Sequence, residues 1–510
     1  MDTIKLSNSI QLKISDVVNI SRGSVKLELS DDKDWISIIN KGSDSVADIC
    51  SNGRKIYGIT TGFGDSVDRD VSVEKTTKLQ YNLAKFHGCG LGKKLSREMA
   101  RAVLVCRLTS LKNGHSGIRI KVLDRIIELL KKDIIPVIPE EGSVGASGDL
   151  TPLSYLAAVL YGERKVYYKG EIRDTADVYR ELGIEPIVPE PKETLSIMNG
   201  TSVMTAISCF AFLRAEYIAS LSSTITALAS LALMADSGHF DDRIFAAKPF
   251  PGQRKIAELI RRDYGKLNYK YRIQAPYSIR CAPHVIGVLA DSLPWMRNFI
   301  ETELNSTNDN PLVDTETGEF LHTGNFYGGH IAFVMDSMKN AVANIADLLD
   351  RQFALLADYK TNNGLPWNLS GASDKSINHG FKAVQIAVSS WTAEALQKTM
   401  PLTSFSRSTE CHNQDKVSMG TIAARDCIRV IELTEQVCAA ALFAFSQAVE
   451  IRIKQGELSE ENLTEKISRI KKNVLDTAGF VLDDRPLDES LEKIITLIVD
   501  QDFDVQIPVL

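Results

Sequence analysis

The chain has 510 residues, of which 44% are hydrophobic and 24% charged, and this composition excludes a disordered, collagen-like or low-complexity protein. Its 59 Lys and Arg against 65 Asp and Glu give a formal charge of -6, without the basic excess that binding to nucleic acid or an anionic membrane requires. We therefore expect small molecules and other protein subunits as partners. Eight cysteines without a C-x-x-C pair, and an N-terminus without a secretory signal, predict a cytoplasmic protein with no structural metal and no disulfide framework.

Apolar residues at helical spacing dominate the chain, which predicts a mainly α protein built from long helices. The uncharged stretch Tyr217–Ala235 is interrupted by Ser and Thr, which favours a buried bundle helix over a membrane span. We expect an N-terminal region, residues 1–200, and a central long-helix and C-terminal helical region, residues 201–510. The other predicted helices are Glu98–Leu111, Val122–Lys132, Met335–Leu356, Ile377–Met400 and Thr421–Ile451.

Three stretches rich in Gly, Asn and aromatic residues break this helical pattern, and loops of this kind on a rigid scaffold commonly carry chemistry. They are Ile56–Asp65, Glu141–Thr151 and Glu303–Gly329. The second contains GSVGASGDLTPL at residues 142–153, where Thr151 and Pro152 predict the N-cap and first turn of a helix that runs to about Tyr161. A phosphate-binding turn is disfavoured, because the segment lacks both the G-x-G-x-x-G order and a Walker-type Gly-Lys-Ser/Thr.

The segment at 142–153 resembles the cofactor-forming loop of the aromatic amino acid ammonia-lyases and aminomutases, the superfamily of histidine, phenylalanine and tyrosine ammonia-lyases. The resemblance implies a mainly α, long-helix bundle of the histidine/phenylalanine ammonia-lyase type. It also implies a homotetramer whose active sites draw residues from more than one subunit. Further matching motifs are IYGITTGFG (56–64), SIMNGT (196–201), QAPYSIR (274–280), ELNSTNDNP (303–311) and GNF (324–326).

The same resemblance implies that Ala146, Ser147 and Gly148 form a built-in cofactor, 4-methylidene-imidazol-5-one (MIO), without a metal. In the family the Gly amide nitrogen attacks the Ala carbonyl carbon, and two waters are lost. The residue types suit this chemistry, since Gly148 offers an unhindered amide nitrogen, Ala146 is a small acyl partner, and Ser147 carries a β-hydroxyl that can be eliminated.

Carried over in the same way, Tyr57 is the base that removes the β-proton and Arg280 binds the substrate carboxylate, for which a guanidinium fork is suited. A phenol has a reference pKa of about 10, so Tyr57 needs a positive local field, such as that of helix N-termini, to act as a base. The resemblance gives the positioning of the amino group and the cofactor to Asn199, Gln274 and Tyr277, with Tyr277 among the catalytic residues, and the lining of the site to Asn310 and Phe326.

Selectivity for the substrate ring depends in this family on a pair that matches Phe86 and His87 and on a position that matches Gln414. The histidine enzymes typically have Ser-His and Glu there. Gln414 offers no charge to an imidazole and Phe86 presents an apolar face, so phenylalanine is favoured over histidine, with tyrosine a close second. His87 keeps the choice open, because its imidazole can contact a phenol oxygen or another imidazole.

Some positions depart from the family pattern, and they bear on rate and pH dependence more than on reaction type. Ala275 replaces an acidic residue, Ala282 and His284 replace Gln, and Lys416 stands where the phenylalanine and tyrosine enzymes are commonly apolar. We expect an ammonia-lyase that converts an aromatic L-amino acid to an α,β-unsaturated acid. The alternatives are a histidine ammonia-lyase, an MIO-dependent 2,3-aminomutase, or an inactive helical scaffold.

Overall fold

The computed structural model describes residues 2–267, 269 and 272–508. The chain forms two compact units, each assembled from three segments. Unit 1 comprises the described parts of Met1–Phe210, Arg297–Asp336 and Pro401–Arg425, and unit 2 those of Ala211–Met296, Ser337–Met400 and Asp426–Leu510. Four of the segment boundaries fall inside the long helices α9, α13, α14 and α16, and the fifth, between Met400 and Pro401, lies between α15 and α16. The division of the chain between residues 200 and 201 stays a prediction.

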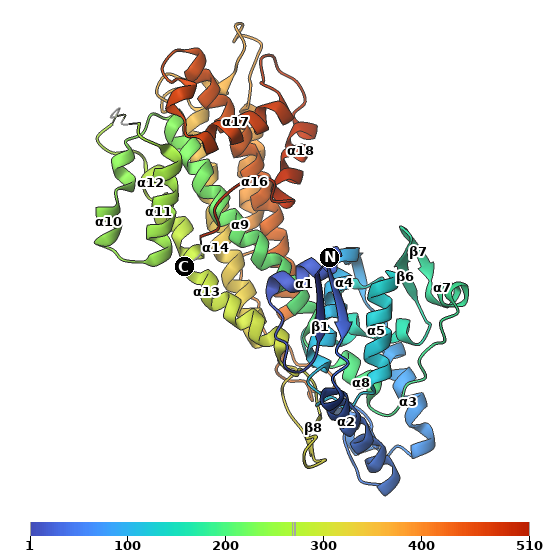
Figure 1. Ribbon diagram of the computed structural model, residues 1–510. Coiled ribbons are helices and arrows are strands. Elements are labelled where there is room, and N and C mark those ends of the chain that lie inside the picture. Colours follow the sequence, from blue (N-terminus) through green and yellow to red (C-terminus); the bar gives the residue numbers. More distant parts are fainter. Residues whose placement is uncertain (1, 268, 270–271, 509–510) are drawn as a thin grey trace. The chain divides into compact units, whose positions relative to one another are not determined.

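Unit 1 packs short helices and small sheets around an apolar interior (Figure 1). Helices α3, α6 and α8 contact one another, and α4 packs against α1 and α5. β1 and β2 pair in parallel, whereas the other pairings, β3 with β5, β4 and β7 with β6, and β8 with β9, are antiparallel. The elements that lie wholly in unit 1 are β1 Asp2–Leu6, α1 Ile14–Arg22, β2 Val25–Leu29, α2 Lys33–Asn52, η1 Gly64–Asp68, α3 Val73–Phe86, β3 Leu91–Lys94, α4 Arg97–Leu111, α5 Ile120–Lys132, β4 Ile135–Pro136, β5 Pro139–Glu141, α6 Leu150–Leu160, β6 Lys165–Tyr168, β7 Glu171–Asp174, α7 Thr175–Leu182, α8 Glu193–Met198, β8 Leu312–Val313 and β9 Phe320–Leu321.

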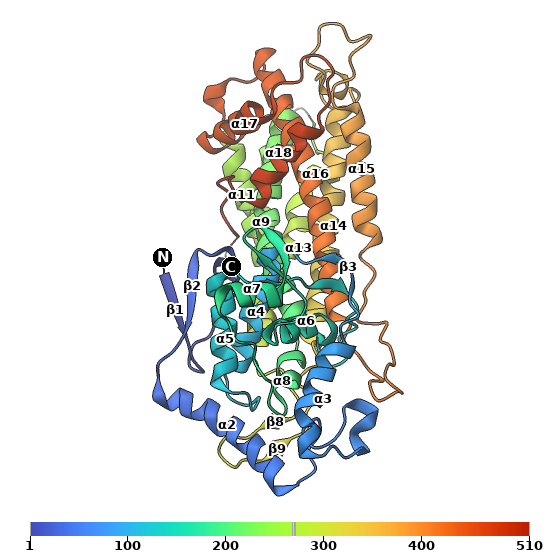
Figure 2. The ribbon, with the colours of Figure 1, turned by 90° about the vertical axis from the view of Figure 1, so that its right-hand side faces the viewer.

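Unit 2 is a bundle in which α9, α13, α14 and α16 run alongside one another, as Figures 1 and 2 both show. Within it, Arg214 of α9 donates from Nε to Glu435 of α16 at 2.9 Å, and the rings of Phe353 and Phe445 join α14 to α16 at 5.7 Å. The helices that cross between the units are α9 Ser202–Ala232, α13 Ala282–Asn305, α14 Gly329–Ala357 and α16 Gly420–Lys454. Those wholly in unit 2 are η2 Ser237–Phe240, α10 Asp242–Ala246, α11 Pro251–Tyr264, α12 Tyr277–Arg280, η3 Trp367–Leu369, α15 Lys382–Gln397, η4 Glu460–Asn462, α17 Glu465–Ala478 and α18 Asp488–Val499.

Several polar residues of α9 form hydrogen bonds within the helix, which helps a Ser- and Thr-rich segment to be buried. Ser222 Oγ donates to the carbonyl oxygen of Ile218, and Ser230 Oγ donates to that of Thr226, both at 2.7 Å. Among the described residues, α9 is the one helix long and apolar enough to cross a membrane, and 83% of its most apolar window is buried within the protein. This agrees with the predicted buried bundle helix.

Most predicted helices agree with the structure to within a few residues, but α14 begins at Gly329, before the predicted Met335, and two other starts differ. The helix predicted over Ile377–Met400 is α15, which begins at Lys382, because the Asp484 carboxylate accepts the backbone N–H groups of His379 and Gly380 ahead of it. The predicted N-cap Thr151 is also wrong. Helix α6 begins at Leu150 with Asp149 as N-cap residue, and Thr151 lies inside the helix.

Candidate active site

The Gly-rich loop between β5 and α6 brings the backbone of Ala146 and Gly148 together. The two residues form a local β-bridge, and Gly148 forms a second one with Gly200. Gly148 has a φ of +68°, and a Cβ placed there would meet the Gly200 carbonyl oxygen at 2.1 Å, so only glycine fits. The tripeptide is therefore already bent with its two ends close, the geometry that ring closure between Ala146 and Gly148 needs.

Asp149, which directly follows this tripeptide, ties the loop to the starts of two long helices. Its Oδ2 accepts the backbone N–H groups of Val203 at 3.0 Å and Met204 at 2.9 Å, in the first turn of α9. Its Oδ1 accepts from Ser143 Oγ at 3.1 Å and from the hydroxyl of Thr421 in α16. Burial raises the pKa of the Asp149 carboxyl, and the hydrogen bonds to its charged form oppose that shift. Sequence reasoning missed this residue.

A cavity of about 460 Å³ opens over Ser147, and all of its lining residues belong to unit 1. It collects side chains that lie far apart along the chain. The predicted site residues in its lining are Tyr57, Phe86, His87, Ala146, Ser147, Asn199, Asn310, Phe326 and Gln414. Residues in its lining that sequence reasoning did not assign to the site are Phe63, Gly64, Leu83, Leu150, Leu195, Glu410, Asn413, Asp415 and Lys416.

The phenol of Tyr57 lies beside the turn that follows it, and its oxygen accepts the Gly64 N–H at 3.0 Å. Burial raises the pKa of Tyr57, the charge of Glu410 raises it further, and the Gly64 hydrogen bond lowers it. Within one chain, burial and the Glu410 charge thus outweigh the Gly64 hydrogen bond, and the pKa of Tyr57 is raised, not lowered as its expected role as a base requires.

The segment 409–414 contributes three polar residues to the cavity lining, Glu410, Asn413 and Gln414. Thr409 and Gln414 exchange backbone hydrogen bonds at 2.9 and 3.2 Å, and the three residues between Thr409 and Asn413 all have positive φ, between 50° and 64°. Gln414 Nε2 donates to Ser147 Oγ at 3.4 Å. The Glu410 carboxylate accepts the Asp65 N–H and lies against Gly64, where a Cβ would meet it at 2.3 Å. Glu410 is thus a carboxylate of the site that motif matching did not find.

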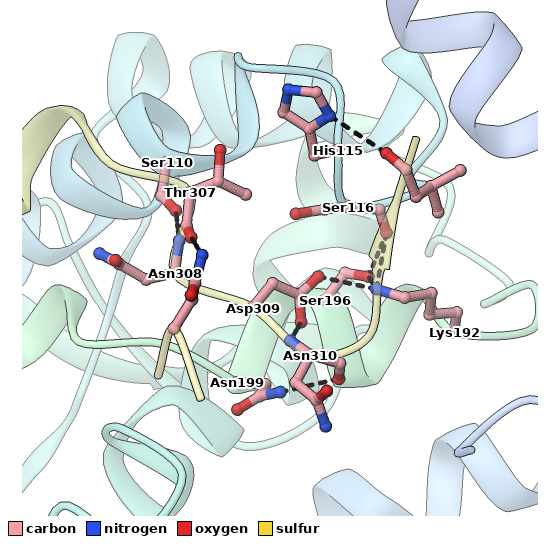
Figure 3. A network of polar contacts seen from close by, with 12 residues as sticks. Ser110, His115, Ser116, Lys192, Ser196, Asn199, Thr307, Asn308, Asp309 and Asn310 are labelled. Carbon is pink, nitrogen blue, oxygen red and sulfur yellow. Dashed lines mark hydrogen bonds and ion pairs between the residues drawn. The ribbon is translucent and has the colours of Figure 1, made fainter. Parts of the chain in front are cut away.

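Asn199 and Asn310 are held by a buried polar network (Figure 3). Lys192 and Asp309, both fully buried, form an ion pair at 2.7 Å, and the second oxygen of Asp309 accepts the Asn310 N–H at 2.7 Å. Asn199 Nδ2 donates to the Asn310 carbonyl oxygen at 2.9 Å. Among the described residues, no partner reaches Asn199 Oδ1, a buried acceptor on a side chain that lines the cavity.

Phe86 and His87, the pair expected to select the substrate ring, lie at the end of α3, and the centroids of their own rings are 4.5 Å apart. Burial lowers the pKa of His87 to about 4, so its imidazole is neutral near pH 7 and can donate one hydrogen bond and accept another.

Gln274, Tyr277 and Arg280 belong to unit 2, on and beside α12. Arg280 Nε donates to the Ala275 carbonyl oxygen at 3.1 Å, and the guanidinium lies 4.6 Å over the ring of Tyr277, which is 72% exposed. The structure thus groups nine predicted residues around one cavity in unit 1, with Gly148 in the loop beside them, and three in unit 2. Within the described residues, no group of three or more His, Cys, Asp or Glu side chains could hold a metal ion.

Residues 12–472 match the model of a family described as aromatic amino acid lyase. The chain is 36% identical over 446 residues to a histidine ammonia-lyase of Shouchella clausii, covering 86% of this chain and 88% of that protein. It is 32% identical to a histidine ammonia-lyase of Caldanaerobacter subterraneus, over 93% and 92% of the two chains. Its fold matches a tyrosine aminomutase from Streptomyces globisporus with a TM-score of 0.91 at 30% identity, covering 99% of this chain and all of that one. A phenylalanine aminomutase of Pantoea agglomerans matches with a TM-score of 0.90 at 27% identity, over 98% and 99% of the two chains.

Proposed function

Because the chain belongs to the aromatic amino acid lyase family and is a carbon–nitrogen lyase, we propose that it eliminates ammonia from an aromatic L-amino acid through MIO formed from Ala146, Ser147 and Gly148. Phenylalanine is the preferred substrate and tyrosine the second, and the product is a cinnamate-type α,β-unsaturated acid. The observation that carries the proposal is the cavity over Ser147, which joins the bent tripeptide, Tyr57, a free amide acceptor and an aromatic ring pair.

The residues of the loop fit the cofactor. Gly148 is held beside Ala146 at a φ that only glycine tolerates, and Asp149 fixes the C-terminal end of the tripeptide through buried hydrogen bonds. Once formed, MIO supplies an electrophilic methylidene carbon to which the substrate amine can bind. The Ser147 hydroxyl, which accepts from Gln414 Nε2, is lost in its formation, and this frees the Gln414 donor for the cavity.

The side chains of the site divide the remaining work between them. Tyr57 takes the β-proton, and Arg280 binds the carboxylate through its Nη atoms while its Nε stays on Ala275. Asn199 Oδ1 can accept from the substrate ammonium, and Asn310 lies on the same network. Glu410 provides the negative charge that an ammonium ion needs in a cavity of low dielectric.

Gln274, Tyr277 and Arg280 complete the site as a carboxylate clamp on unit 2. We infer a homotetramer in which the clamp of one subunit serves the cavity of another, as the family resemblance implies. In this arrangement the positive charge of the other subunit's Arg280 also lowers the pKa of Tyr57, which burial and Glu410 raise within one chain.

A histidine ammonia-lyase is the second candidate. It is favoured by the names of the relatives from Shouchella clausii and Caldanaerobacter subterraneus, and by Glu410, a cavity carboxylate that could pair with an imidazolium. Against it, Gln414 gives the position beside Ser147 no charge.

Incubation of the purified enzyme with phenylalanine, tyrosine and histidine, followed by ammonia measurement and product identification, tests the proposal. We expect cinnamate from phenylalanine as the fastest reaction and the coumarate analogue from tyrosine second. Urocanate as the main product would establish the histidine alternative, and a β-amino acid with little free ammonia would establish an aminomutase.

A further inference from the structure

The backbone of Ala275, inside the carboxylate clamp, is tied on both sides. Its carbonyl oxygen accepts from Arg280 Nε at 3.1 Å, and its N–H donates to His239 Nε2 at 2.9 Å. Ala275 is 8% exposed, so this residue is buried between the Arg280 and His239 side chains. The orientation of the Arg280 guanidinium thus depends on a peptide that His239 holds.

His239 lies in a turn that is itself anchored. The turn is the 3₁₀ segment η2, in which Asp236 Oδ1 accepts the Gly238 N–H at 2.7 Å. Arg261 of α11 donates from Nη1 to the carbonyl oxygen of Phe240 at 2.7 Å. The imidazole therefore presents Nε2 to the clamp from a fixed base.

A backbone N–H can only donate, so His239 Nε2 has to be the unprotonated nitrogen of a neutral ring. Protonation would put one N–H against another and remove the hydrogen bond. Burial and the charge of Arg280 lower the pKa of His239, whereas Asp236 raises it. Arg261 on α11 faces the turn as well, and the charges of α10 nearby, Asp242 and Arg243, are paired with Arg254 and Asp241.

We propose that His239 is a positioning residue whose neutral imidazole holds the clamp segment Gln274–Arg280 in its carboxylate-binding geometry, and whose protonation releases that segment. The inference rests on the proposed function, since it needs Arg280 to bind the substrate carboxylate. Substrate affinity should therefore fall at low pH through the protonation of His239 in unit 2. This effect is separate from the ionisation of Tyr57 in unit 1.

The first test compares His239→Gln with His239→Leu in the full-length enzyme over pH 5 to 9, with the substrate that the panel identifies. Gln offers an amide oxygen that accepts the Ala275 N–H but does not titrate, and Leu offers no acceptor. In the parent, KM should rise as pH falls below 6.5, the ordinary imidazole value. We expect His239→Gln to keep KM within about threefold of the parent near pH 8 and to lose the acid-side rise. His239→Leu should raise KM about tenfold near pH 8, the cost of one hydrogen bond to the clamp, with kcat changed less, and its KM should approach that of the parent as pH falls, because protonation breaks the same hydrogen bond in the parent. His379→Gln, which removes an exposed imidazole of the same unit, is the matched control.

The second test is hydrogen–deuterium exchange of the peptide that contains Ala275, compared between the variants and the parent at the same pH. Faster exchange in His239→Leu, with parent-like exchange in His239→Gln, is the expected result and needs no activity. The inference would be overturned if KM still rose at low pH in His239→Gln. It would also be overturned if KM and the exchange rate of His239→Leu stayed at parent values. If exchange is faster in His239→Leu and parent-like in His239→Gln, but the enzyme turns over no amino acid of the panel, the proposed function is wrong and His239 has no role in catalysis. The hydrogen bond between the Ala275 N–H and His239 would still be supported.

Discussion

Within one chain, burial and the Glu410 carboxylate both raise the pKa of the Tyr57 phenol above 10.0, its ordinary value, and in the proposed assembly the Arg280 guanidinium of another subunit acts against that shift. If Tyr57 is the base, kcat/KM should rise with pH, by up to about tenfold per pH unit between pH 7 and 9, because the ionised fraction rises in that proportion below the pKa. Tyr57→Phe should lower turnover by about 10²-fold or more and abolish that rise, while the circular dichroism spectrum and the mass deficit left by the loss of two waters stay as in the parent. Turnover near the parent level in this variant would assign the proton to another group.

The ring pocket makes a separate prediction at Phe86 and Gln414. Phe86→His introduces a donor that can reach a phenol oxygen, so activity on tyrosine should rise relative to phenylalanine, by an order of magnitude where the hydroxyl is otherwise unpaired. Gln414→Glu should favour histidine, whose imidazole can carry a proton to the new carboxylate. The measurement is relative kcat/KM for the three amino acids, with Phe333→His, a change at an exposed ring outside the cavity lining, as control. Unchanged ratios in both variants would show that the ring lies elsewhere.

Single residues were predictable where a local motif specified them and not where the contact is long-range. Nine of the residues named from motifs line one cavity, and each of them belongs to a short motif that is contiguous in the sequence. Asp149 and Glu410 were missed because their partners, such as Thr421 and Asp65, lie hundreds of residues away and leave no local spacing. The pKa of Tyr57 could not be anticipated for the same reason.

Helix α13 ends with a buried acid that links it to the start of α9. Glu303 Oε1 accepts from Thr201 Oγ1 at 2.6 Å, and burial raises the pKa of Glu303 from 4.5 to about 7, with a smaller contribution from Asp149. The folded state therefore binds this proton more tightly than the unfolded state. Its contribution to stability is complete below pH 4.5 and is lost as pH rises to about 7, by about 3 kcal/mol.

Glu303→Gln keeps an acceptor for Thr201 without the titration, so we expect it to be stabilising at pH 8 relative to its effect at pH 5. Thermal unfolding midpoints of parent and variant at the two pH values measure this, and Glu316→Gln, at an exposed site of the same unit, is the control. An equal shift of the midpoint at both pH values would contradict the raised pKa.

Long elements followed from periodicity more reliably than their ends did. Helices α4, α5 and α16 begin and end within about three residues of their predictions, whereas α14 starts before its predicted first residue and α15 starts after its own, beyond the backbone N–H groups that the Asp484 carboxylate accepts. The N-cap of α6 was misplaced because Asp149 serves α9 with its side chain and α6 only with its backbone. Capping preferences consider only the residues near one helix end, so they cannot predict that a side chain is used by another helix.

For the whole molecule, composition and periodicity predicted the mainly α class but not the assembly of two units from interleaved segments. The division depends on where four long helices pass from one set of neighbours to another, and their apolar patterns continue through those points.

The assembly proposed for the clamp can be measured directly. Sedimentation equilibrium should give a mass near four times 56.3 kDa. Mixing the impaired Tyr57→Phe variant with the impaired Arg280→Ala variant under conditions of subunit exchange should restore part of the activity, because some cavities with an intact Tyr57 then meet an intact clamp from another subunit. A monomer with full activity would mean that one chain supplies both.

The central claim is that Ala146, Ser147 and Gly148 become the electrophile, and intact-mass measurement of the purified chain tests it most directly. The mass should be about 36 Da below that of the sequence, the loss of two waters, and the loss should map to the peptide containing Ser147. Ser147→Ala, which has no hydroxyl to eliminate, should not form the methylidene group and should be inactive. A parent chain that releases ammonia from an aromatic amino acid at its full, unmodified mass would contradict the account.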